Sequence, residues 1–163
     1  MACLSVFADG SLFDAAVAVT GHVELPETPA AAPMAREFVR GYLDGVPPQI
    51  CADVLLLTSE LVTNVLLHAR TRVHLGVTRD ADNVFVCVQD HSERTTYERA
   101  DKTPDALRET RRAMAIIASL ADDFGWKRLP NEVGKVMWFV MGAKEHPTML
   151  QLELDPEWPV RLI

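Results

Sequence analysis

The sequence predicts an α+β fold in two layers, in which a mixed or antiparallel sheet carries its helices on one face. Three observations lead to this prediction. Strand-like segments occur in pairs joined by short polar turns, which is typical of hairpins. Two helical segments follow each other without a strand between them. The resulting order, β-α-α-β-β-loop-α-β-β, lacks the regular strand–helix alternation of a parallel sheet.

The first part of the chain supplies a strand and a pair of helices. Residues 13–25 are apolar and β-branched around their middle, and Pro26 ends this strand. Residues 29–44 carry apolar side chains at helical spacing, and a glycine followed by prolines ends this helix. The second helix covers residues 53–70, with Pro48 near its start, so a tight link joins the two helices.

The remaining elements are two hairpins, a long polar loop and a third helix. Val73, Leu75 and Val77 alternate with other residues, as expected of a half-buried strand. A polar stretch as long as 91–105 is usually a functional lid or a disordered segment. The expected elements are strands at 71–78 and 84–88, the loop at 91–105, a helix at 106–121 and strands at 124–129 and 133–141.

The composition predicts one globular domain. The chain has 163 residues, of which 48% are hydrophobic and 24% charged, enough for a single core. We assign residues 1–142 to this domain. Residues 143–163 form a C-terminal extension that is either an added edge strand or an arm packed on a partner.

The charge balance and the cysteines restrict the class of protein. Sixteen basic and 23 acidic residues give a net charge of −7, which argues against nucleic-acid and anionic-membrane partners. The first residues lack the basic region of a signal peptide, and no uncharged apolar run approaches about 18 residues, so we expect neither a signal peptide nor a membrane span. Its three cysteines match no metal-binding spacing, so we expect a cytoplasmic location.

Three polar side chains interrupt the long apolar helix. Glu60, Asn64 and His68 stand four residues apart, so they form one stripe along one helix face. Carboxylate and carboxamide oxygens one turn apart can hold a hydrated Mg²⁺ together with substrate phosphates. Such groups cost free energy when they are buried without partners. The pattern alone fits a solvent-facing stripe on a core helix equally well.

The run LLLTSELVTNVLLHA resembles the first ATP-binding motif of the histidine kinase-like (GHKL, Bergerat-fold) ATPases. It resembles in particular the small bacterial anti-sigma-factor serine kinases and their actinobacterial relatives. In that branch an acidic residue, three small or apolar residues, an asparagine and three further residues precede His-Ala. Glu60, Asn64, His68 and Ala69 match this pattern.

Two further segments carry the resemblance. Asp90 follows the second hairpin strand, where the family has its adenine-contacting aspartate. Gly134 and Lys135 begin a segment, GKVMWF, that resembles the family's Gly-Lys-Thr-Val-Trp strand and implies nucleotide contacts there. The resemblance extends from Val23 to Val140 and implies the Bergerat ATP-binding fold.

The resemblance also implies a role for each matching residue, with ATP and Mg²⁺ as cofactors. Asn64 would be the Mg²⁺ ligand, and Asp90 would accept a hydrogen bond from the adenine amino group. Glu60 would act as the catalytic residue that orients or deprotonates a water or a partner's serine hydroxyl. For His68 we expect helix packing or a lid contact.

The lid region departs from the family pattern. Glycines there let backbone amides approach phosphate oxygens, but the aligned segment is Arg111-Arg112-Ala113. Val136 replaces the threonine that usually follows Gly-Lys. Either Arg108, Arg111 and Arg112 hold phosphates by side-chain charge, or the site is degenerate and only the fold and its partner surface are kept.

Three functions are consistent with the sequence. The first is an ATP-dependent regulator of the anti-sigma kind, which sequesters a sigma factor and phosphorylates a serine on an antagonist. The second is a non-catalytic protein-binding module of the same fold, without nucleotide. The third is a small-molecule sensor that uses the same pocket. The resemblance implies a homodimer for the first function.

Overall fold

The structure, a computed structural model, describes residues 19–92, 104–128 and 133–142. Within these residues, five strands form one sheet with the order β1-β2-β3-β5-β4. Every neighbouring pair is antiparallel, as the hairpin-like spacing of the sequence indicated. The strands are β1 (Val19–Leu25), β2 (Val73–Arg79), β3 (Asn83–Asp90), β4 (Asp123–Arg128) and β5 (Lys135–Gly142).

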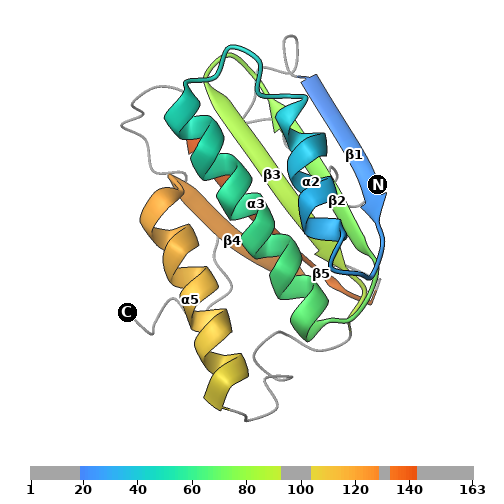
Figure 1. Ribbon diagram of the computed structural model, residues 1–163. Coiled ribbons are helices and arrows are strands. Elements are labelled where there is room, and N and C mark those ends of the chain that lie inside the picture. Colours follow the sequence, from blue (N-terminus) through green and yellow to red (C-terminus); the bar gives the residue numbers. More distant parts are fainter. Residues whose placement is uncertain (1–18, 93–103, 129–132, 143–163) are drawn as a thin grey trace.

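Within the described part of the chain, three helices lie on one face of this sheet, which confirms the predicted fold class (Figure 1). They are α2 (Ala31–Arg40), α3 (Pro48–His68) and α5 (Pro104–Leu120). The long helix α3 lies between the other two and packs on β2, β3 and β5. Helix α2 packs on β1 and β2, whereas α5 packs on β4.

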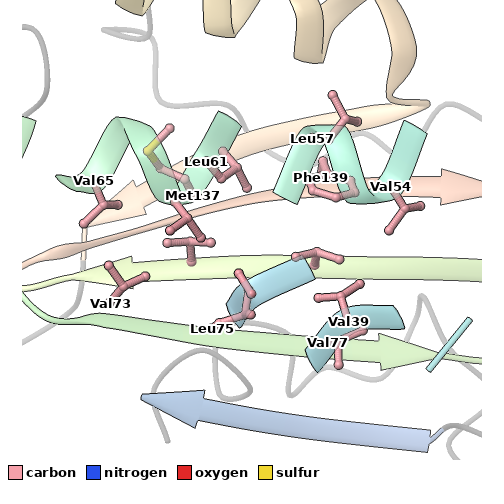
Figure 2. Close-up of a cluster of buried hydrophobic side chains, with 14 of the residues drawn as sticks. Val39, Val54, Leu57, Leu61, Val65, Val73, Leu75, Val77, Met137 and Phe139 are labelled. Atoms are coloured by element: carbon pink, nitrogen blue, oxygen red, sulfur yellow. The ribbon is translucent and has the colours of Figure 1, made fainter. Parts of the chain in front are cut away.

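The hydrophobic core fills the space between α3 and the sheet. Figure 2 shows Leu57 and Leu61 of α3 and Phe139 of β5 within one cluster of buried hydrophobic side chains. These three side chains are at most 2% exposed. By length and composition α3 would be able to cross a membrane, and no other helix of the described residues passes that test. Helix α3 contacts the sheet and both other helices. Core packing therefore explains its apolar composition.

Helix α2 is shorter than the sequence predicts. It ends at Arg40, whereas its apolar spacing suggested an end at Asp44. The chain tightens there into three-residue turns, beginning with the Gly41 N–H, which donates to the Phe38 carbonyl at 3.2 Å. Leu43 is nevertheless 5% exposed. The apolar spacing therefore suggested one more helical turn, because Leu43 is buried from the turn that follows the helix.

Helix α3 begins earlier than the predicted residue 53. Pro48 occupies its first turn, where a missing N–H costs nothing and the fixed φ angle suits a helix. At the other end Arg70 adopts a left-handed φ of 52°, and its N–H donates to the Val65 carbonyl at 3.1 Å. This left-handed termination turns the chain back toward β2.

Several sequence predictions concern residues outside the described ranges. They include the first part of the predicted strand at 13–25, most of the loop at 91–105, the turn between the last two strands and the extension at 143–163.

Truncation of the α3 core should destabilise the fold strongly. We expect Leu57→Ala to lower the free energy of unfolding by about 2–5 kcal/mol, because it removes a buried side chain and leaves a cavity. Leu56→Ala is the matched control, since Leu56 is 41% exposed on the same helix, and it should cost about 0.5 kcal/mol or less. Urea unfolding followed by circular dichroism measures both, and equal losses would contradict this placement of α3.

Candidate nucleotide site

The polar stripe of α3 runs from the surface into the core. Each step of four residues rotates about 40° around a helix, so the stripe drifts as it descends. Glu60 is half-buried, whereas Asn64 and His68 are 5% and 7% exposed. For Asn64 and His68 the interpretation as a solvent-facing stripe is therefore wrong.

The stripe faces the α5 side of α3. On the other side, Arg36 of α2 donates a hydrogen bond to Ser59 Oγ at 2.9 Å. Ser59 and Asn64 lie on opposite flanks of α3 by helical rotation. Since α3 separates α2 from α5, Asn64 lies on the flank toward α5, above β5 (Figure 1).

Asn64 has a buried oxygen without a hydrogen-bond partner. Its Nδ2 donates to Met137 Sδ at 3.6 Å, but no described group donates to Oδ1. Such an unmade hydrogen bond costs about 1–3 kcal/mol, and buried exceptions of this kind often mark functional sites. A carboxamide oxygen is also a ligand type that Mg²⁺ accepts. The donor chemistry at Asn64 therefore fits the predicted metal ligand.

Asp90 and Lys135 form a buried ion pair at the ends of β3 and β5. The register places the two residues directly opposite each other. Lys135 Nζ lies 2.5 Å from Asp90 Oδ2, and the two side chains are 5% and 1% exposed. Among the described residues, the Lys135 ammonium is the group that contacts Oδ2.

Ser92 fixes the other oxygen of the Asp90 carboxylate. Its N–H and its Oγ–H donate to Asp90 Oδ1 at 2.9 and 2.8 Å, and Lys135 Nζ donates to Ser92 Oγ at 3.3 Å. Asp90, Ser92 and Lys135 thus hold one another in place. Lys135 and Met137 both face the helices from β5, so this cluster lies one pleat from Asn64.

Gly134 permits the close approach of the two strand ends. It has a φ of 132°, and a Cβ at this position would lie 2.1 Å from the Asp90 carbonyl oxygen. A side chain there would push β5 away from Asp90. Gly134, which the sequence predicts to contact nucleotide, is thus also required for the packing of β5 against Asp90.

The arginines proposed to replace the lid glycines are exposed. Arg108, Arg111 and Arg112 lie on the N-terminal half of α5. This half and the C-terminal end of α3 lie toward the same end of the domain (Figure 1). The structure brings Asn64, Asp90 and Lys135 together on the inner face of the sheet. The contact of the arginines with phosphates stays a prediction.

Sequence reasoning missed two members of this site. They are Ser92, which donates to Asp90 Oδ1, and Met137, whose Sδ accepts from Asn64 Nδ2. Both follow from the pairing of β3 with β5, which sets Asp90 opposite Lys135. Alternation along the paired strands was the signal that would have found them, because it places every second residue on the same face.

Two histidines contact each other beside this cluster. The ring of His91, the residue after Asp90, meets the ring of His74 edge-on at 4.9 Å. Burial, and then the neighbouring His91, lower the pKa of His74, while Glu24, 3.8 Å away, opposes this shift. The folded state therefore resists protonation of His74.

Acidification should weaken the fold through His74. Because its pKa is lowered in the folded state, His74 binds a proton less readily there than in the unfolded chain. The free energy of unfolding therefore decreases as the pH falls below 6.5, the ordinary pKa of a histidine. We expect His74→Gln to flatten the fall in the urea midpoint between pH 7.5 and 5.5. An unchanged slope would contradict this assignment.

Removal of one partner of the buried ion pair should destabilise the domain. Lys135→Met leaves the Asp90 carboxylate buried without a counter-charge, which should cost about 3–5 kcal/mol. The double variant Lys135→Met/Asp90→Asn should recover most of this loss, because no unpaired charge remains. Urea unfolding at neutral pH measures all three proteins. A double variant as unstable as the single one would contradict the pairing.

Comparison with known proteins agrees with this geometry. Residues 25–141 match the family model of the histidine kinase-like ATPase domain. No curated protein sequence matches. Among solved structures, a chain of the SiaB–SiaC complex from Pseudomonas aeruginosa has a TM-score of 0.54 and 15% sequence identity. The match covers 74% of this chain and 88% of that chain, and at this identity it supports the fold alone.

The family match extends from the end of β1 to β5 and includes every residue of the buried cluster. The chain therefore belongs to the histidine kinase-like ATPase domain family.

Proposed function

We propose that this protein is an ATP- and Mg²⁺-binding regulator of the anti-sigma type, which controls transcription by binding a partner protein. One observation carries the proposal: the buried, unpaired Oδ1 of Asn64 lies on the inner face of the sheet, one pleat from the Asp90 carboxylate. Because the chain belongs to an ATPase domain family, we interpret this arrangement as a site for ATP and Mg²⁺.

The polar residues of α3 suit the metal end of such a site. Asn64 would offer its free Oδ1 to Mg²⁺, which would neutralise phosphate charge when bound. Glu60 lies one turn earlier and is half-buried at the rim of the same flank. From there its carboxylate would orient a water or a partner's serine hydroxyl.

Asp90 suits the base end of the site. Ser92 holds its Oδ1, whereas Oδ2 contacts Lys135 and would accept from an amino group with its remaining lone pair. The Lys135 ammonium balances the carboxylate in the absence of solvent. Together these contacts fix the direction from which an adenine amino group would donate.

The regulatory part of the proposal rests on family and analogy. The structural neighbour is part of a complex between two proteins, SiaB and SiaC. By analogy, the partner here is a sigma factor or its antagonist, and the protein acts in the bacterial cytoplasm as a homodimer. Kinase turnover on a partner serine would require phosphate contacts from Arg108, Arg111 and Arg112 in place of lid glycines.

A second candidate is a non-catalytic partner-binding module of the same fold. A specific observation favours it: Lys135 already neutralises the carboxylate that would contact adenine, so the charge of this carboxylate is balanced by the protein itself. The exposed side chains of the three α5 arginines agree with this candidate, since solvated arginines are typical of a helix surface.

A nucleotide titration separates the two candidates. With Mg²⁺ present, we expect saturable binding of fluorescent ATP that weakens by about tenfold or more in Asn64→Ala, because one buried charge-assisted contact is lost. Thr63→Ala is the matched control, since Thr63 is exposed on the same turn of α3, and its affinity should be unchanged. Circular dichroism verifies that both variants fold.

Absence of saturable binding at millimolar ATP would overturn the first candidate. Pull-down against purified sigma factors and their antagonists then tests the second one. Capture of such a partner by a chain that binds no ATP would establish the non-catalytic module.

A further inference from the structure

The carboxamide of Asn64 is held by a sulfur atom. Its Nδ2 donates to Met137 Sδ at 3.6 Å, across the packing of α3 on β5. Within the described part of the chain this is the one hydrogen bond of the Asn64 side chain, since Oδ1 has no partner. The direction in which the carboxamide points therefore depends on Met137.

Packing alone fixes the direction of a carboxamide poorly. Its two ends have nearly the same shape, so two orientations that differ by a half-turn fill the same space. They differ in chemistry, because the NH2 end donates and the oxygen end accepts. A thioether sulfur accepts weakly and has no proton to donate. Met137 Sδ therefore favours contact with the NH2 end of Asn64 over contact with its oxygen end.

This choice of orientation decides whether Asn64 can bind a cation. The nitrogen and the oxygen of a carboxamide lie on opposite sides of Cγ, so an NH2 group held by the sulfur leaves Oδ1 on the side away from it. Mg²⁺ is bound by oxygen atoms. In the reversed orientation the amide protons, which carry partial positive charge, would face the cation and repel it.

We propose that Met137 is the positioning residue of the metal ligand: its sulfur holds Asn64 so that Oδ1 is presented to Mg²⁺. The proposal rests on the proposed binding of ATP and Mg²⁺ at this site. Met137 acts only through Asn64, to which it is joined by a hydrogen bond between β5 and α3.

The position of Met137 on β5 relates it to the other end of the site. Continuous pairing with β3 places Lys135 and Met137 on the helix face of the sheet. Their Cα atoms are about 7 Å apart, the length of two residues in a strand. Lys135 contacts Asp90, and Met137 contacts Asn64. One strand thus orients the polar groups at both ends of the proposed site.

A test must separate the sulfur from the bulk of the side chain. Met137 belongs to the buried cluster of Figure 2 and is 2% exposed, so truncation would also damage the core. Met137→Leu removes the acceptor and nearly conserves the volume. Met141→Leu is the matched control, because Met141 is 6% exposed on the same face of β5. It lies about 13 Å further along the strand.

Nucleotide titration measures the effect on the metal end. Fluorescent ATP is titrated into each protein with Mg²⁺ and, separately, with EDTA. We expect Met137→Leu to weaken binding about three- to tenfold with Mg²⁺, because the carboxamide then populates both orientations. Binding in EDTA should be unchanged. A purely structural role of Met137 would alter both affinities together, and Met141→Leu should alter neither.

An NMR spectrum of the ligand-free protein tests the orientation without nucleotide. In isotope-labelled protein, the side-chain amide signal of Asn64 is identified by its absence in Asn64→Ala. We expect Met137→Leu to move this signal, because the amide loses its acceptor. Met141→Leu should leave it in place. Circular dichroism verifies that each variant folds.

Two results would overturn the role of Met137. One is a wild-type protein that binds ATP with Mg²⁺ no better than Met137→Leu does. The other is an Asn64 signal that Met141→Leu moves as far as Met137→Leu. Absence of saturable binding by the wild-type protein is a different failure, because it overturns the proposed function and with it the metal role of Asn64. The amide spectrum distinguishes the two cases, since it needs no nucleotide.

Discussion

The packing of α3 against the inner face of the sheet determines both the core and the candidate site. Leu57 and Leu61 are buried in the core between α3 and its neighbours, where water is excluded. The same contact sets the rotation of α3 about its axis. Because that rotation is fixed, Asn64 is carried into the interior while Glu60 stays near the surface. A polar group is thus buried as a consequence of apolar packing elsewhere on the helix.

Local patterns were sufficient to predict most of the fold. Apolar density identified α3, and polar turns between alternating segments identified the hairpins and hence an antiparallel sheet. The end of α2 was predicted wrongly, because Leu43 is buried from a turn and apolar spacing cannot distinguish that from another helical turn. The expected position of Pro48 near the start of α3 is confirmed, since Pro48 is the first residue of the helix.

The site was predictable only as separate residues. Asn64 and Asp90 were identified by motif, but the ion pair of Asp90 with Lys135 depends on strands that are 45 residues apart in sequence. Which side chains share a face of the sheet depends on register, and register is a property of two strands together. For the same reason, the burial of β3 and β5 along nearly their whole length was visible in the sequence only as unusually continuous apolar runs.

The close contact at Gly134 has a consequence for the alignment of the two central strands. A slip of β5 by one position would bring a residue with a Cβ against the Asp90 carbonyl, where a side chain does not fit. The same slip would turn Lys135 away from the helices and leave the Asp90 carboxylate without its positively charged partner. The absence of a Cβ at Gly134 thus selects a single pairing register for β3 and β5 during folding.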